Sequence, residues 1–135
     1  MKGIKVFFMI ASIFGAVVSP LAVATGPDWS TGQGLVDTCK VISTPEKQAS
    51  DEDVAALLFC VAQFKTWRDS WVFADAFNER KYNKRGPICI SNLISNKTLI
   101  EGFLQWAKYG MTAELKRQPS TSSVFTYMSA LYPCK

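Results

Sequence analysis

Apolar residues recur at helical spacing along the chain, and the clearest run lies between residues 50 and 74. Its apolar and aromatic positions are separated by three or four residues: Leu57, Cys60, Phe64, Trp67, Trp71 and Ala74. This spacing places all six on one face of a helix. Ser50 followed by Asp53 is a near match to a capping box, and acidic residues there suit the start of a helix. The pattern predicts a long helix with one buried face.

Three shorter stretches, at 35–42, 95–110 and 124–131, show the same spacing and predict three more helices. Their main apolar positions are Leu35, Cys39, Ile42, Leu99, Ile100, Phe103, Trp106, Ala107, Met111, Val124, Met128 and Leu131. Ser95 is a suitable N-cap for the third helix, and Pro133 follows the last one. Alternation typical of strands does not extend beyond a few residues. The sequence therefore predicts one all-α domain, a small bundle of about four helices.

The first 24 residues have the pattern of a secretory signal peptide. A positive start, an apolar run and a small-residue cleavage site follow one another at Lys2 and Lys5, Val6 to Val18, and Ala22-Val23-Ala24. A membrane anchor is the alternative, but Ser19-Pro20 interrupts the run before the roughly 20 residues that a span requires. We therefore expect a signal peptide over 1–24 and a mature domain over 25–135. The mature domain is therefore expected to be exported, without stable insertion into a membrane.

All four cysteines, Cys39, Cys60, Cys89 and Cys134, lie after the expected cleavage site. An even number in a short exported chain indicates two disulfides. Four cysteines allow three pairings, and helix order favours one of them. The first two helices are joined by a short loop and are expected to be antiparallel, as are the last two. That arrangement favours Cys39–Cys60 and Cys89–Cys134, which would staple the bundle.

The chain has 15 basic and 11 acidic residues and no histidine. The lack of histidine excludes Ser–His and Cys–His catalysis, and together with the absence of a CxxC pair it argues against a metal site. Asp69 and Asp75 are six residues apart and do not share a helix face, so no acid–base pair is evident. We expect no enzyme activity, no metal and no cofactor. Without Lys2 and Lys5 the net charge is +2, which implies no nucleic-acid partner.

Two short basic segments are the candidates for contact with a partner. The first comprises Arg80, Lys81, Tyr82, Asn83, Lys84 and Arg85, and the second comprises Lys116, Arg117 and Gln118. Gly86-Pro87 follows the first segment and favours a turn. The first segment is either a solvated helix end with its loop or a loop that binds a partner, because exposed loops commonly carry binding. The second segment is expected to be a turn. These choices follow from expected exposure.

The ordered set of motifs resembles the Rap1a/Tai family of immunity proteins. The motifs span most of the mature chain: Gly32-Gln33-Gly34-Leu35-Val36-Asp37-Thr38-Cys39, Cys60, Cys89-Ile90, Ile94-Ser95-Asn96-Lys97-Thr98-Leu99 and Tyr132-Pro133-Cys134. Ser91 stands where that family usually has proline. The resemblance implies that residues 25–135 form an immunity domain of the periplasm. Its partner would be a cognate secreted effector of type VI secretion, a peptidoglycan amidase whose active site it occludes. The resemblance also implies a possible homodimer.

Three other functions compete with this hypothesis. A small periplasmic stress chaperone or general binding protein is the main alternative, although a chain without histidine lacks the usual trigger near neutral pH. A small exported hydrolase would need acid–base or nucleophilic groups that the sequence does not bring together. A helical bundle that binds a ligand would use the aromatic residues. We interpret Trp67 and Trp71 as core residues, with stacking on a ligand as the alternative.

Overall fold

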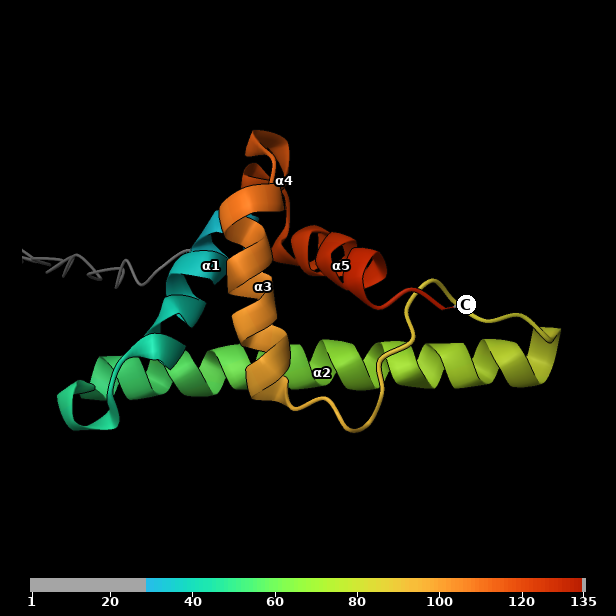
Figure 1. Cartoon of the computed structure of the whole chain (residues 1–135), viewed down its shortest axis with the longest axis horizontal. Coiled ribbons are helices and arrows are strands. Elements are labelled where there is room, and N and C mark those ends of the chain that lie inside the picture. Colours follow the sequence, from blue (N-terminus) through green and yellow to red (C-terminus); the bar gives the residue numbers. More distant parts are fainter. Residues whose placement is uncertain (1–28, 135) are drawn as a thin grey trace, which may run out of the picture.

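The computed structural model describes residues 29–134 (Figure 1). The predicted signal peptide over 1–24 lies outside the described residues. Five α-helices and two short 3-10 helices follow one another within this part of the chain: α1 (Gly32–Cys39), η1 (Lys40–Ser43), η2 (Glu46–Gln48), α2 (Asp51–Tyr82), α3 (Asn96–Gly110), α4 (Ala113–Arg117) and α5 (Ser120–Leu131). The same residues contain no strand, so the prediction of an all-α fold is confirmed. Sequence reasoning missed α4, which is a single short helix of five residues.

Helix α2 is by far the longest element, with 32 residues, or about 48 Å at the usual rise. It contains neither proline nor glycine, and its two ends are well capped. The side chain of Ser50 accepts a hydrogen bond from the backbone of Asp53, and the Asp53 carboxylate accepts one from the backbone of Ser50. At the other end Asn83 adopts a left-handed conformation with φ 52°, which stops the helix.

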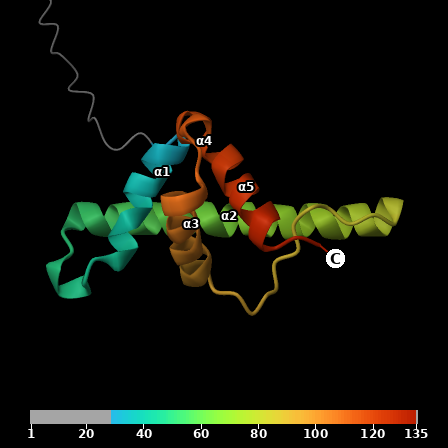
Figure 2. The same cartoon turned by 45° about the horizontal axis from the view of Figure 1, so that its top comes forward.

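Helices α1 and α3 and the 3-10 helix η1 pack against α2, whereas α4 and α5 pack on α1 and on each other (Figures 1 and 2). In both views α1 and α3 cross α2 steeply, so the antiparallel arrangement expected for the first two helices is not what forms. The last part of α2, residues 72–82, extends beyond the other helices, and we call it the arm. The chain then folds back along the arm through residues 83–95, which we call the return segment. Because the shorter helices do not cover the arm, a larger part of α2 is exposed to solvent than the sequence pattern predicted.

The core lies between α2 and the crossing helices. Its fully buried side chains include aromatic, aliphatic and sulfur groups from α1, α2, α3 and α5: Leu35, Cys39, Cys60, Phe64, Leu99, Ile100, Phe103, Val124, Tyr127 and Met128. Along the predicted face of α2 only Cys60 and Phe64 are fully buried, whereas Trp67 and Trp71 are half-buried and Ala74 is exposed. The predicted stripe is therefore a core face only in its first half.

Two close approaches in this core require glycine. A Cβ on Gly32 would lie 2.3 Å from Ser123 Oγ and 2.4 Å from the backbone oxygen of Leu115. A Cβ on Gly102 would lie 2.3 Å from the hydroxyl of Tyr127. That hydroxyl donates a buried hydrogen bond to the carbonyl of Leu99 at 3.0 Å, and burial raises the pKa of Tyr127 well above its usual range. Gly32 thus lets α1 pack directly against α4 and α5.

Both predicted disulfides are present, Cys39–Cys60 with a Cα–Cα distance of 5.4 Å and Cys89–Cys134 with 4.8 Å. The first joins the end of α1 to α2 inside the core. The second ties the return segment to the end of the chain, where the backbone N–H of Cys89 also donates to Tyr132 at 2.8 Å. With sequence separations of 21 and 45 between the bonded cysteines, each bond contributes about 3–4 kcal/mol on the chain-entropy model. Such bonds are typical of proteins from oxidising compartments.

Replacing Gly32 with alanine is expected to lower the free energy of unfolding by about 2–3 kcal/mol, because the new methyl group meets backbone that cannot move aside. Gly102→Ala should also destabilise the protein, because the new methyl group displaces the buried Tyr127 hydroxyl from its hydrogen bond to Leu99. Urea unfolding of both variants measures the difference. Equal stability of Gly32→Ala and the unmodified protein would contradict the packing described here.

The capping box of α2 predicts a pH dependence. The backbone and the hydroxyl of Ser50 donate to the Asp53 carboxylate, at 2.9 and 2.7 Å, and hold the pKa of Asp53 below its ordinary value. Because the pKa of Asp53 is lower in the folded protein than in the unfolded chain, its ionised carboxylate stabilises the folded state. This stabilisation is complete above the unfolded-state pKa and is lost as the pH falls through the folded-state pKa. Asp53→Asn should therefore lower Tm near neutral pH and make little difference at about pH 2. An equal loss at both pH values would contradict this assignment.

Candidate partner-binding surface

The first predicted segment forms the far end of the arm, and we call residues 80–85 the tip. Arg80, Lys81 and Tyr82 form the last turn of α2, and Asn83 caps it. The segment is therefore a helix end with its loop, the first of the two alternatives that the sequence left open. Asn83 reverses the chain and begins the return segment, which continues through residues 84 and 85. All six residues of the tip are exposed.

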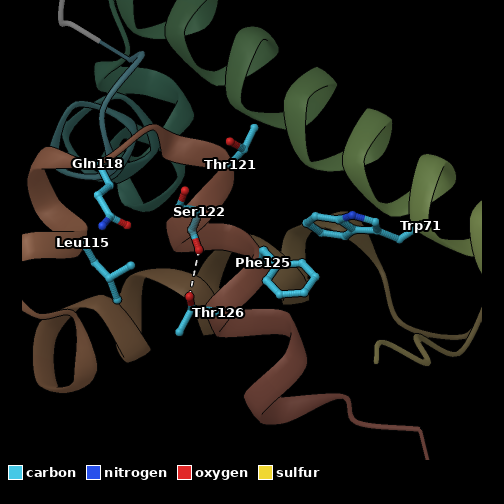
Figure 3. A pocket seen from close by; sticks show the side chains of 7 residues that line it. All are labelled: Trp71, Leu115, Gln118, Thr121, Ser122, Phe125 and Thr126. Atoms are coloured by element: carbon cyan, nitrogen blue, oxygen red, sulfur yellow. Dashed lines mark hydrogen bonds between the residues drawn. The ribbon is translucent and has the colours of Figure 1, made fainter. Parts of the chain in front are cut away.

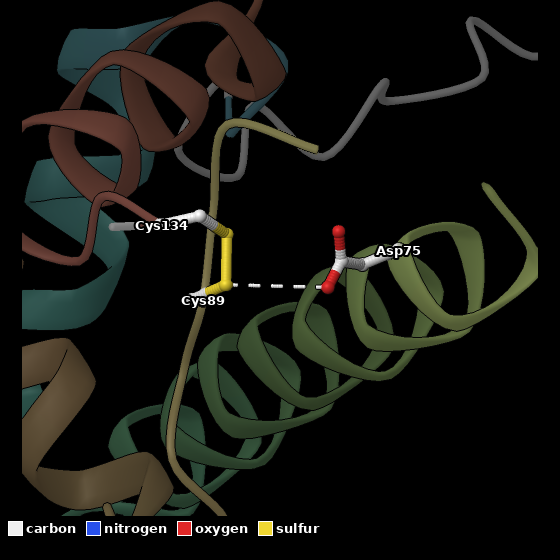
Figure 4. Close-up of side chains that lie close together, drawn as sticks. All are labelled: Asp75, Cys89 and Cys134. Atoms are coloured by element: carbon white, nitrogen blue, oxygen red, sulfur yellow. Dashed lines mark hydrogen bonds between the residues drawn. A yellow bond between two sulfur atoms is a disulfide. The ribbon is translucent and has the colours of Figure 1, made fainter. Parts of the chain in front are cut away.

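Carboxylates on α2 hold the return segment against the arm. Arg85 Nε and Nη2 both donate to Glu79 Oε1, each at 3.1 Å. One turn earlier, the Asp75 carboxylate accepts a hydrogen bond from the backbone N–H of Gly86. The other Asp75 oxygen lies 4.0 Å from Cys89 Sγ (Figure 4). That approach is a contact and not a hydrogen bond, because a disulfide sulfur carries no proton.

The same place brings together Asp75, Cys89 and Cys134, whose possible ligand atoms lie within 4.8 Å of one another. Thiolates bind metals, but these two sulfurs are bonded to each other. The carboxylate alone is a poor metal site. The cluster therefore has a structural role: it fixes the base of the return segment on the arm.

A hollow of about 510 Å³ opens at the tip and is lined by Asn78, Tyr82, Lys84 and Arg85. Its walls offer an amide, a phenol, an ammonium and a guanidinium group. Next to it, Lys81 Nζ lies 5.4 Å from the ring centre of Phe77 and 5.2 Å from that of Tyr82. Among described residues, Lys84 has no carboxylate partner within ion-pair distance. The tip thus presents positive charge around an exposed aromatic ring.

The second predicted segment lies at the corner between α4 and α5. Lys116 and Arg117 end α4 and are exposed, while Gln118 caps that helix and is half-buried. Gln118 Nε2 donates to Glu114 Oε1 at 2.9 Å. This segment was expected to be a turn, and it forms one short helix instead.

Gln118 also lines a groove of about 440 Å³ between α2 and α5, shown in Figure 3. The complete lining is Trp71, Leu115, Gln118, Thr121, Ser122, Phe125 and Thr126. The rings of Trp71 and Phe125 meet edge to face with their centres 5.9 Å apart. The groove therefore combines two aromatic rings with hydroxyl and amide groups and contains no charged side chain.

A smaller hollow of about 70 Å³ connects these two sites. It shares Trp71 and Phe125 with the groove and Asn78 with the hollow at the tip. Trp71, Asn78 and Tyr82 follow one face of α2, so the three depressions form a strip along the helix. Sequence reasoning missed Asn78 and Phe125 and assigned Trp71 to the core. The spacing of Trp71 from Phe64 did place it on the correct face, but spacing alone does not show where the covering helices end.

The strip has side chains that are free to contact a partner. The carboxylates nearest to the tip, Asp75 and Glu79, are engaged in holding the return segment. The tip therefore presents aromatic and cationic side chains at the end of α2. It lies next to the uncharged groove that Trp71 and Phe125 line. A surface of this kind fits a folded partner that offers acidic groups around an apolar pocket.

No family model matches the chain, and no characterised protein or solved structure shows significant similarity to it. The resemblance to the Rap1a/Tai family therefore stays a prediction. Within residues 29–134, none of the helices is both long enough and apolar enough to cross a bilayer.

Replacing Asp75 with alanine removes the acceptor for the Gly86 N–H. Amide hydrogen exchange at Gly86 should become about tenfold faster, because a hydrogen bond to a charged group is lost. Asp75→Asn retains an acceptor oxygen and is the matched control, with exchange close to that of the unmodified protein. Unchanged exchange in Asp75→Ala would show that the return segment is held by other contacts.

Proposed function

We infer that the mature protein is an immunity protein of the periplasm, which binds a secreted peptidoglycan amidase delivered by type VI secretion and occludes its active site. The observation that best supports this function is the tip, which stands clear of the body at the end of the arm. A projecting cationic end with an exposed ring can enter a cleft that a flat surface cannot. Its action is steric: while the tip fills the cleft, the peptidoglycan strand has no access to it.

The anchoring of the tip supports tight binding. The Arg85–Glu79 pair, the Asp75–Gly86 hydrogen bond and the Cys89–Cys134 disulfide all fix the return segment before any partner arrives. A segment that is already ordered loses little conformational freedom on association, so more of the contact energy appears as affinity. The disulfides also agree with an oxidising compartment, which is where an amidase would meet its substrate.

Charge at the tip supports fast association. Four cations lie within residues 80–85, and among the residues that the structure describes only Arg85 has an ion-pair partner, Glu79. Cations at the edge of an interface attract and orient an acidic partner, which raises the association rate at low salt. An inhibitor that must capture an incoming toxin benefits from such steering. We therefore propose that the rim of the amidase cleft is acidic.

The tip is expected to control the association rate. Lys81→Glu with Lys84→Glu should slow association with the amidase about tenfold at low salt, because attraction becomes repulsion. Lys47→Glu with Lys108→Glu makes the same change in net charge away from the tip and is the matched control. Surface plasmon resonance gives both rates. Equal association rates for the two double variants would remove the tip from the interface.

Protection of cells tests the function itself. Exporting this protein together with a secreted cell-wall hydrolase encoded beside its gene should restore growth. The alternative function, a stress chaperone, is favoured by the exposed rings of Phe73 and Phe77. A chaperone would suppress aggregation of many unfolded proteins and bind no folded amidase tightly. That outcome, with growth unchanged for every such hydrolase, would contradict the immunity function.

A further inference from the structure

A cleft of about 300 Å³ opens where α1, α3 and α4 meet (Figure 1). It shares no residue with the tip or with the strip. Its floor is formed by four apolar side chains from α1, from α3 and from the residue that follows α3: Val36, Leu104, Ala107 and Met111. The last three are spaced by three and four residues, which places them on one side of α3. The cleft is therefore a site separate from the proposed amidase contact.

Three exposed lysines form the rim of the cleft, namely Lys40, Lys108 and Lys116. Within the described part of the chain, only Lys40 of these three has an ion-pair partner, Asp37. Lys108 Nζ lies 5.1 Å from the ring centre of Tyr109, a contact that leaves N–H groups of the ammonium available to an anion. Lysine stems lie along apolar surface while their ammonium groups stay in water. The rim is therefore cationic above an apolar floor.

The charge of this rim is not balanced within the cleft. No acidic side chain of residues 29–134 lines it. Asp37, beside the cleft, is already engaged, because its two carboxylate oxygens accept hydrogen bonds from Gln33 Nε2 at 3.1 Å and one of them binds Lys40. Lys108 and Lys116 thus give the cleft an excess of positive charge. An anionic group placed at the rim would be attracted to both ammonium groups.

Size and charge together define the ligand. A volume of about 300 Å³ is at the lower end of the range for small-molecule sites. It holds about ten non-hydrogen atoms, at the ~30 Å³ that a water-sized group occupies. A membrane lipid with two long acyl chains is much larger than this. A molecule with one short hydrocarbon chain and one anionic group matches both the floor and the rim. A carboxylate has two acceptor oxygens and can therefore bind two ammonium groups at once.

We propose that this cleft binds a free short-chain carboxylate of about the size of octanoate. The hydrocarbon chain lies against Val36, Leu104 and Met111, and the carboxylate accepts hydrogen bonds from the ammonium groups of Lys108 and Lys116. Met111 is unbranched and adaptable, so it can adjust to the chain. Lys116 belongs to the second basic segment, whose role then differs from that of the tip. Binding at the cleft needs no amidase and does not depend on the proposed function.

An NMR titration of the purified, disulfide-bonded mature protein with octanoate tests the site. We expect saturable shifts of the backbone amides of Val36, Leu104 and Met111, with a dissociation constant below about 1 mM. Octanol has the same chain without the charge, and acetate has the charge without the chain. Each should bind at least about tenfold more weakly than octanoate. Absence of saturable shifts at these amides, or equal affinity for octanoate and octanol, would overturn the proposal.

Substitutions separate the rim from the floor. Lys108→Gln with Lys116→Gln should weaken octanoate binding about tenfold and leave octanol binding unchanged, because only the contacts of the carboxylate are lost. Lys47→Gln with Lys65→Gln removes the same charge elsewhere and is the matched control, with unchanged affinity. Leu104→Gln should weaken the binding of both octanoate and octanol, and circular dichroism checks that each variant folds.

A membrane lipid could offer the same chemistry, and vesicles of phosphatidylglycerol distinguish that source. The proposal predicts no stable binding of the protein to such vesicles through the cleft. Vesicle binding that is lost in Lys108→Gln with Lys116→Gln, combined with no response to octanoate, would assign the cleft to a lipid surface and contradict the proposal. Equal octanoate affinity of this variant and its lysine control would contradict it as well.

Discussion

The length of α2 is the constraint on which the rest of the structure depends. A helix of 32 residues is longer than the four shorter helices can cover, so its last part, residues 72–82, stands outside the core. The return segment cannot bury the arm, but it is fixed on one face by Asp75, Glu79 and the Cys89–Cys134 disulfide. These contacts make a rigid projection from a helix that would otherwise carry a loose loop.

The two faces of the arm have different chemistry. One face continues the buried stripe of α2 as a strip of hollows that ends among cations at the tip. The opposite face carries the exposed rings of Phe73 and Phe77. Only the first of these faces is used in the proposed contact with an amidase.

The sequence predicted four of the five α-helices in the described part of the chain and both disulfides, because these depend on local spacing, caps and chain order. It did not predict where α2 leaves the core. Trp71, Ala74 and Phe64 obey the same spacing, yet only Phe64 is fully buried, because burial depends on which residues of α2 the crossing helices cover, as α3 covers Phe64 through Phe103. The basic residues of the tip were identified from composition alone. Asn78 on α2 and Phe125 on α5 lie near the same strip only because distant segments of the chain pack together. The sequence around each residue does not show that packing.

The central claim is that the tip and the strip beside it contact a folded amidase. Hydrogen exchange followed by mass spectrometry, with and without the amidase, tests this most directly. We expect slower exchange in peptides that cover residues 78–88 and 118–126, and little change in η1 and η2 at the far end of α2. Protection confined to η1 and η2, or no protection anywhere in the presence of a bound amidase, would contradict the account.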